Sequence, residues 1–201
     1  MSISVIIPAL NDAETISTAL NCLLKQPNDF EVIVVDEHDN AKGVMDKIEV
    51  HQKAILHRAV SVFIINSRGD WILQQRAMGK YHSAGLWSNT CCTHPAPHET
   101  IEEAAGKRLM EEMGMTCIPL HKAFHFIYRA ELDNGLTEHE LDHIFYGFCD
   151  NEPRINPDEV MAWKAVTPHQ LERELLVNPH NYTVWFRMLF PRMKAFLETL
   201  S

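Results

Sequence analysis

Several residues in the chain could carry protons during a reaction. Cys91 and Cys92 are adjacent in the segment SNTCCTHP, residues 88–95, and His94 follows two positions later. A cysteine is most often a small buried apolar residue, whereas a thiol beside metal ions or cations can be tuned into an acid–base group. Both interpretations are open for this pair.

Histidines and acidic residues form a second group. His51 and His57 precede an apolar run that begins near residue 59, and Glu138 and Glu140 lie two positions apart. This spacing places both carboxylates on one face of a strand, where they repel each other unless a cation or a proton lies between them. With His94, these residues would offer nitrogen and oxygen ligands to a divalent transition metal. Each histidine alone is more often a surface or core residue.

These residues need a scaffold, and the hydrophobic pattern predicts a mixed α/β protein. Thr100–Met113 is the best helix, because Thr100 and Glu103 form a capping-box pair and Gly114 can end the helix. The other predicted elements are strands at 30–36, 59–66, 71–75, 124–132, 138–148 and 162–166, and helices at 168–176 and 183–200. Strands dominate the middle and helices flank them, which favours a layered fold with a mixed sheet over an alternating Rossmann pattern.

Composition limits the classes of function. The chain has 201 residues, of which 46% are hydrophobic, so it can bury a core as a single main domain. Its net charge of −9 argues against a general nucleic-acid binder, and an anionic ligand would need local cations or metal ions. No apolar run is long enough to suggest membrane association, and the N-terminus lacks signal-peptide features. Five cysteines, an odd number, do not suggest a disulfide framework, so we expect a cytoplasmic protein.

The N-terminal residues 1–29 are predicted as an extension that is separate from a domain at residues 30–201. The run SVIIPAL and the segment after it predict a strand, a turn and a helix, and they resemble the opening of nucleotide-sugar glycosyltransferases. A complete enzyme of that class needs far more chain and a cluster of catalytic carboxylates. We therefore favour a strand–helix extension packed on the main domain, with no role assigned to it.

The segment 93–115 resembles the Nudix box, which has a Gly, then Glu, then Arg-Glu, then Glu-Glu-x-Gly. Four residues match this pattern and three stand in for other residue types: Glu99, Glu111, Glu112 and Gly114 match, while Thr93, Lys107 and Arg108 replace Gly, Arg and Glu. Arg108 thus removes a metal-binding acid and adds a guanidinium that can bind phosphate. Because Arg108 and Glu112 are four residues apart on a helix, a simple surface ion pair is the alternative.

Several separated motifs together resemble the type I isopentenyl-diphosphate isomerases, a branch of the Nudix superfamily. The resemblance covers about residues 30–200. It rests on KIEVHQKAILHRA (47–59), QQRAMGK (74–80), GLWSNTCCTHP (85–95), RLMEEMG (108–114), FIYRA (126–130), TEHE (137–140) and NPDEVMAW (156–163). It implies a Nudix-like α/β/α sandwich and an enzyme that interconverts isopentenyl and dimethylallyl diphosphate through a tertiary carbocation. The alternative is a Nudix pyrophosphohydrolase.

The resemblance also implies roles for individual residues. Cys92, rather than Cys91, falls at the catalytic cysteine, and Glu140, Tyr128 and Trp185 fall at the other residues near the reacting carbons. The implied ligands of one Zn²⁺ or Mn²⁺ ion are His51, His57, His94, Glu138 and Glu140. Glu112 and the carbonyl of Cys92 fall at a Mg²⁺ site that bridges to the diphosphate. The implied diphosphate-binding residues are Lys47, Arg76, Lys80 and Arg108. The expected partner is a small diphosphate substrate, without nucleic acid or membrane, and no oligomeric state is implied.

Overall fold

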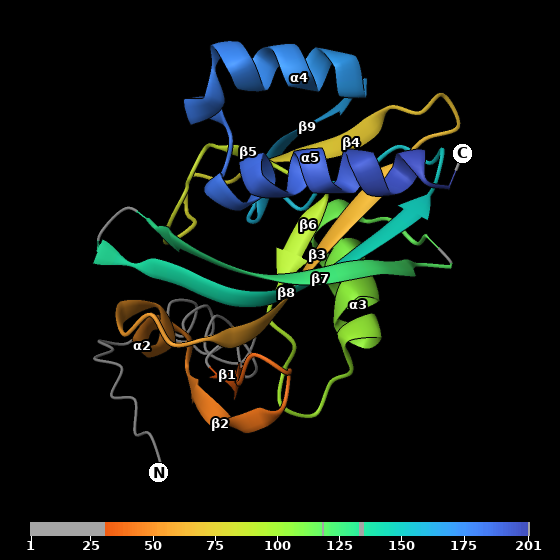
Figure 1. The fold of residues 1–201 in the computed structure, drawn as a ribbon. Helices are drawn as coiled ribbons and strands as arrows, with labels where there is room; N and C mark the ends of the chain where they lie inside the picture. Colours follow the sequence, from red (N-terminus) through yellow and green to blue (C-terminus); the bar gives the residue numbers. More distant parts are fainter. Residues whose placement is uncertain (1–30, 118, 133–134, 201) are drawn as a thin grey trace, which may run out of the picture.

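A computed structural model describes residues 31–117, 119–132 and 135–200 (Figure 1). The predicted N-terminal extension, residues 1–29, lies outside the described residues. Within them, nine strands form one sheet. The strands are β1 (Glu31–Val35), β2 (Ala41–Asp46), β3 (His57–Ile65), β4 (Trp71–Arg76), β5 (Trp87–Ser88), β6 (Cys91–Thr93), β7 (His121–Glu131), β8 (Thr137–Phe148) and β9 (Val160–Val166).

The sheet is mixed because β3 and β8 run parallel, from the pair His57↔Glu140 to the pair Ile65↔Phe148. The remaining strand pairs in the described part of the chain are antiparallel, and the longest of them joins β7 to β8. This pairing places His57, the first residue of β3, beside Glu140, the second glutamate of β8. This register fixes the position of the site described below.

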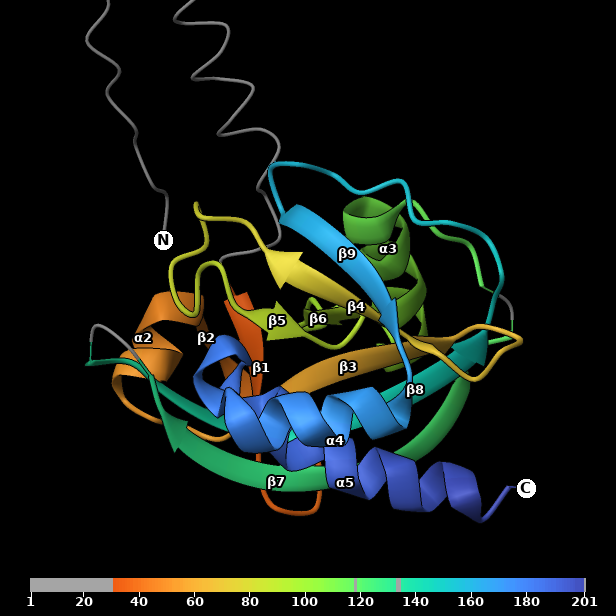
Figure 2. The ribbon, with the colours of Figure 1, turned by 90° about the horizontal axis from the view of Figure 1, so that it is seen from above.

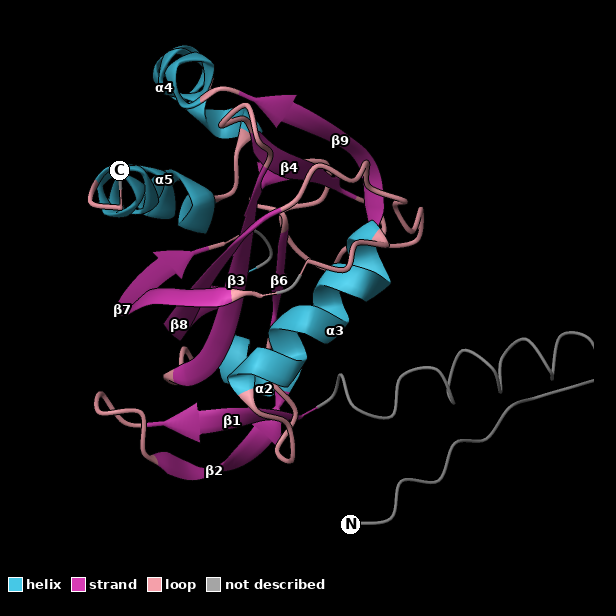
Figure 3. Ribbon diagram, turned by 90° about the vertical axis from the view of Figure 1, so that its right-hand side faces the viewer, coloured by secondary structure: helices cyan, strands magenta, loops and turns pink. Residues whose placement is uncertain are grey.

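Helices cover both faces of the sheet (Figures 2 and 3). One face carries α3 (Ile101–Met113), and the other carries α4 (Pro168–Val177) and α5 (Val184–Glu198). Alternate residues of β3 point into two separate cores: Val62 and Ile64 pack with α3, whereas Phe63 and Ile65 pack with α4 and α5. A strand that is buried on both faces requires an apolar run without alternation, which is what β3 has. The predicted α/β/α sandwich with a mixed sheet is confirmed.

Local sequence signals determine both ends of α3. Thr100 and Glu103 form the predicted capping box, which satisfies free backbone N–H groups at the start of the helix. Gly114 ends the helix in the left-handed region with φ of +60°. A Cβ atom at residue 114 would lie 2.5 Å from the carbonyl oxygen of Arg154, so glycine is required there for two reasons.

The predicted elements agree with the structure to within a few residues, but five short ones were not predicted. They are β2, β5, β6, the helix α2 (Lys47–Gln52) and the 3-10 helix η2 (Pro179–Asn181). The β2 residues are almost all exposed, and β5 and β6 have two and three residues, so none has a hydrophobic period to detect. β3 and β4, which follow each other in sequence, pair only at Ile64↔Ile72 and Ile65↔Trp71, and the rest of β4 pairs with β5 and β9. Among the described helices, none has the length and apolar character needed to cross a membrane.

Candidate active site

A pocket opens beside the parallel pair of strands and collects the predicted site residues from most parts of the domain. Its polar and aromatic lining consists of Lys47, Ser61, Arg76, Lys80, Tyr81, His82, Cys92, Thr93, His94, Arg108, Tyr128, Glu138, Glu140 and Trp185. Thus ten of the residues singled out from the sequence share one pocket: Lys47, Arg76, Lys80, Cys92, His94, Arg108, Tyr128, Glu138, Glu140 and Trp185. His51, His57 and Glu112 lie against the same site and are fully buried or nearly so.

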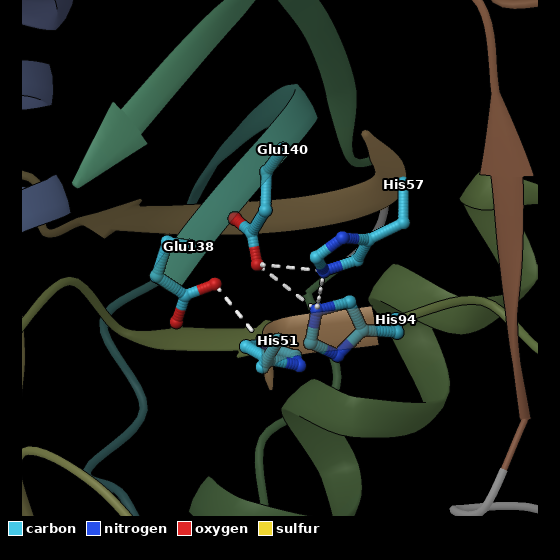
Figure 4. Close-up of side chains that lie close together, drawn as sticks. All are labelled: His51, His57, His94, Glu138 and Glu140. Atoms are coloured by element: carbon cyan, nitrogen blue, oxygen red, sulfur yellow. Dashed lines mark hydrogen bonds and ion pairs between the residues drawn. The ribbon is translucent and has the colours of Figure 1, made fainter. Parts of the chain in front are cut away.

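Three histidines and two glutamates form a compact cluster at one end of this pocket (Figure 4). One ligand atom from each of His51, His57, His94, Glu138 and Glu140 can be chosen so that all five lie within 4.8 Å of one another. His94 Nε2 is 3.1 Å from His57 Nε2 and 2.9 Å from Glu140 Oε1. His51 Nε2 is 3.2 Å from Glu138 Oε2. Five donors that converge in this way suit a divalent cation.

Backbone carbonyls orient two of the three imidazole rings. His51 lies in α2, whose N-cap is Asp46, and its Nδ1 is 2.6 Å from the carbonyl oxygen of Lys47. His57 begins β3, and its Nδ1 is 2.9 Å from the carbonyl oxygen of Ile55. In each ring the Nδ1–H therefore donates to a carbonyl, and the Nε2 lone pair points into the cluster. Histidines that bind metal ions typically have their other ring nitrogen held by a hydrogen bond in this way.

The two glutamates titrate differently although both are buried. Burial raises the pKa of Glu138, and the charge of Glu140 raises it further. Burial also opposes ionisation of Glu140, but its interactions with His57 and His94 outweigh burial and hold the pKa of Glu140 below its usual range. Burial lowers the pKa of His94 to about 3, so this ring is neutral at physiological pH. Neutral imidazole and ionised carboxylate are the forms that bind metal ions.

Cys92 lines the pocket, and two polar side chains lie beside its thiol. Its Sγ donates to Asn89 Oδ1 at 3.2 Å and lies 3.5 Å from Ser61 Oγ. Burial, assisted by the charge of Asp142, raises the pKa of the Cys92 thiol to about 12, so the sulfur keeps its proton. Cys91, the preceding residue, is fully buried in the core beneath α3.

Two aromatic side chains complete the pocket. The Tyr128 hydroxyl donates to Glu140 Oε2 at 2.7 Å, and burial, together with the charge of Glu140, raises the pKa of Tyr128 well above its usual range. Trp185 lies in the first turn of α5 and is 4% exposed. The guanidinium carbon of Arg76 lies 5.3 Å from the centre of its ring, so the indole can face a positive charge.

Four charged groups form a network at the other end of the pocket. The Glu112 carboxylate accepts hydrogen bonds from Lys80 at 3.0 Å and from Gln74 at 2.7 Å, and it pairs with Arg108 at 2.8 Å. Glu159 pairs with the same two cations. Since Glu112 is 1% exposed and Arg108 lines the pocket, their interaction is not the surface ion pair that was the alternative from the sequence.

Several site residues were missed from the sequence. Asp142 continues the period-two series of Glu138 and Glu140 on β8, and it accepts a 2.8 Å hydrogen bond from Ser61, so its spacing was a usable signal. His82 comes two residues after Lys80 and faces Glu138, but a single histidine in a loop carries no spacing signal. Glu159 reaches the cations only through the tertiary fold.

A family model and the relatives that match most of the chain point to the same family. A model described as NUDIX domain matches residues 55–186. An "Isopentenyl-diphosphate Delta-isomerase" of Pectobacterium atrosepticum is 50% identical over 171 residues, which cover 85% of this chain and 95% of that protein. The chain belongs to the isopentenyl-diphosphate Delta-isomerase family. An "Isopentenyl-diphosphate Delta-isomerase 2" of Aromatoleum aromaticum is 48% identical, covering 81% of this chain and 86% of the relative.

Solved structures place this isomerase-family chain in the Nudix fold. A crystal structure from Deinococcus radiodurans superposes with a TM-score of 0.68 at 18% identity and covers 81% of this chain and 98% of that one. A MutT protein from Methanosarcina mazei superposes with a TM-score of 0.57 at 21% identity, covering 70% of this chain and 94% of that one. At these identities the likeness concerns the fold alone.

A second model, described as Glycosyl transferase family 2, matches residues 4–73. This agrees with the resemblance noted for the N-terminal segment, and it covers less than half of the chain. From residue 31 onward, the matched range consists of the helix α2 and of β1, β2, β3 and part of β4, which are strands of the single sheet that carries the pocket. The remainder lies outside the described residues.

Proposed function

We propose that this chain interconverts isopentenyl diphosphate and dimethylallyl diphosphate as a step of isoprenoid biosynthesis. One observation carries the proposal: two proton carriers, Cys92 and Glu140, line the same pocket as four cationic side chains. A reaction that adds one proton and removes another while a diphosphate stays intact needs this combination. The identity of 50% to a named isomerase over most of both chains supports it.

The chemistry explains why the proton carriers are buried. Isomerisation adds a proton to the terminal alkene carbon and removes another from the neighbouring methylene, and a tertiary carbocation lies between the two steps. An alkene is a very weak base, so the acid must be held against it without competing water. The pKa of Cys92 is about 12, so its thiol is protonated at physiological pH. The Glu140 carboxylate interacts with two histidines and accepts a hydrogen bond from Tyr128. Each group can exchange one proton with the substrate.

The carbocation needs a neighbour that stabilises it without reacting with it. Trp185 offers an indole face, and a π face attracts a cation without presenting a localised lone pair. Its indole Nε1 makes no hydrogen bond within the described residues, so the ring is held by packing. Tyr128 acts through its hydrogen bond to Glu140 and so fixes the direction of that carboxyl.

The diphosphate is assigned to the cationic end of the pocket. Lys47, Arg76, Lys80 and Arg108 would bind its oxygens, and an acidic protein can thereby bind an anionic substrate. Glu112 would hold a Mg²⁺ ion together with the Cys92 carbonyl and phosphate oxygens, since Mg²⁺ prefers oxygen ligands and commonly bridges a carboxylate to a diphosphate. Lys80 and Arg108 both pair with Glu112, so the two cations lie next to the carboxylate that would hold Mg²⁺.

The histidine–glutamate cluster is assigned to one Zn²⁺ or Mn²⁺ ion. Three imidazole nitrogens with two carboxylates suit these metals better than Mg²⁺. When bound, the ion would supply positive charge at Glu140 and change the acidity of its carboxyl. A reactive thiol at Cys92 requires reducing conditions, which supports the cytoplasmic location expected from the sequence.

A Nudix pyrophosphohydrolase is the second candidate, since related folds belong to such enzymes. Arg108 argues against it, because this position carries a metal-binding acid in the Nudix box and here pairs with two carboxylates instead. Cys92 would have no function in hydrolysis.

Proton NMR of isopentenyl diphosphate, incubated with the protein and Mg²⁺ in D₂O, tests the proposal. The expected result is dimethylallyl diphosphate with deuterium in a methyl group, without phosphate release. Hydrolysis of the diphosphate without deuterium incorporation would support the second candidate instead.

A further inference from the structure

His82 lies between the histidine–glutamate cluster and Trp185 of the pocket. It is located in the segment between β4 and β5 and is 6% exposed. Its Nε2 is 3.4 Å from Glu138 Oε1, whereas Glu138 Oε2 is 3.2 Å from His51 Nε2. The carboxylate of Glu138 is therefore held between two imidazole rings, one on each oxygen.

The second ring nitrogen of His82 also has a defined partner. His82 Nδ1 is 3.3 Å from the hydroxyl oxygen of Ser83. A hydroxyl that donates to Nδ1 leaves the ring proton on Nε2, which is the nitrogen that faces the Glu138 carboxylate. With this tautomer, the protonated Nε2 of His82 lies 3.4 Å from Glu138 Oε1, a distance at which the imidazole and the carboxylate attract each other.

Ser83, the residue that follows His82, has a strained backbone conformation. Ser83 has φ of +51°, a conformation that is unfavourable for a residue with a side chain, and it is 5% exposed. Tertiary hydrogen bonds hold the segment: Arg76 Nη2 donates to the carbonyl oxygen of His82 at 3.1 Å, and the N–H of Gly85 donates to the carbonyl oxygen of Arg76 at 3.1 Å. The rest of the fold thus maintains a strained residue beside the cluster.

His82 also touches the aromatic wall. Its ring lies edge-on to Trp185, with centroids 5.7 Å apart and an interplanar angle of 82°. One side chain therefore contacts both a candidate metal ligand and the residue assigned to the carbocation. His82 is not one of the five residues whose ligand atoms lie within 4.8 Å of one another, so it contacts a candidate ligand without being one itself.

We propose that His82 is a positioning residue that orients the carboxylate of Glu138 for metal binding, with Ser83 setting the position of its ring proton. The proposal rests on the metal role assigned above to the histidine–glutamate cluster. Carboxylates that bind metal ions are themselves held by hydrogen bonds, and loss of such a partner typically weakens metal binding about 10- to 100-fold.

The test measures Zn²⁺ affinity of the full-length protein by competition with a chromophoric chelator, after removal of bound metal. His82→Phe keeps an aromatic edge against Trp185 but cannot contact Glu138 through a ring nitrogen, and we expect about 10- to 100-fold weaker Zn²⁺ binding. His82→Gln retains an N–H donor and should recover most of this loss. The matched control is His143→Phe, which removes another buried histidine of the sheet, one that faces Asp39 rather than the cluster. Its Zn²⁺ affinity should be unchanged.

Ser83→Ala gives an independent route to the same answer if His82→Phe does not fold. Alanine at residue 83 carries the same backbone strain as serine and lacks only the hydroxyl, so weaker Zn²⁺ binding in a folded Ser83→Ala protein supports the proposal. Unchanged affinity in His82→Phe, or in Ser83→Ala where that is the only folded variant, would overturn it, as would an equal loss in His143→Phe. Complete loss of Zn²⁺ in His82→Phe would make His82 a ligand and also overturn it.

This measurement separates the proposal from the isomerase assignment. Zn²⁺ affinity does not depend on the substrate, so His82 keeps its positioning role even if no dimethylallyl diphosphate forms. Conversely, an active isomerase whose His82→Phe variant binds Zn²⁺ normally would retain its function and refute the role of His82.

Discussion

Replacing Tyr128 with phenylalanine removes one hydroxyl from a closely packed and buried site. The hydroxyl donates a 2.7 Å hydrogen bond to Glu140 Oε2, and the other carboxylate oxygen is already occupied by His94 at 2.9 Å. Both Tyr128 and Glu140 are less than 10% exposed, so water does not readily replace the lost donor. The full effect of the hydrogen bond should therefore appear in Tyr128→Phe.

The expected magnitude follows from the charge of the acceptor. A hydrogen bond to a charged group contributes about 1.5–3 kcal/mol, which corresponds to a loss of about 10- to 150-fold in kcat if the bond acts fully in the proton-transfer step. Because the bond favours the ionised carboxylate, its loss should raise the pKa of Glu140. The limb of the kcat profile that Glu140 governs should therefore move to higher pH.

Steady-state conversion of isopentenyl diphosphate, measured across pH, checks this expectation. Tyr182→Phe is the matched control, because the Tyr182 hydroxyl also donates to a carboxylate, Glu174, but does not line the pocket. Both variants should lose stability in a thermal melt, whereas only Tyr128→Phe should lose kcat. A folded Tyr128→Phe protein with normal kcat and an unshifted profile would show that the reasoning about Glu140 is wrong.

Three further outcomes are expected. Cys92→Ala should lower turnover by several orders of magnitude, beyond the ~10²–10⁴ of a single acid–base group, while Cys91→Ala remains active; near-normal turnover in Cys92→Ala removes this thiol from the mechanism. His57→Ala should lose the tightly bound transition metal in elemental analysis, and a full metal content would disprove the assigned site. Arg108→Lys keeps the charge but loses the planar fork, so KM should rise while kcat is partly preserved; unchanged kinetics in a folded protein would exclude Arg108 from diphosphate binding.

Much of the fold could be predicted because its long elements carry strong local signals. The helix at Ile101–Met113 has a capping box and a terminal glycine, and β7 and β8 are long enough to show a pattern. The short helix α2 has six residues and places His51 in the pocket, yet nothing in its composition predicts a helix there. Its position depends on the Asp46 cap and on packing against the sheet.

The composition of the site was also predictable, while its internal connections were not. Glu138 and Glu140 were expected on one face of a strand, and they are adjacent in the pocket. By contrast, the contact between Glu159 and Arg108 joins a loop to a helix 51 residues away in sequence. No spacing rule links two such residues, because their proximity results from how β9 pairs with β4.

The parallel pairing of β3 with β8 also has a consequence for folding. It brings Ser61 next to Asp142, 81 residues apart in sequence, and His51 next to Glu138, 87 residues apart. Contacts of such high contact order form late, because the entropy of closing a long loop opposes them until the intervening chain is ordered. The pocket therefore forms together with the whole domain, and a nascent chain that has not yet reached β8 lacks both glutamates and cannot assemble the proposed metal site.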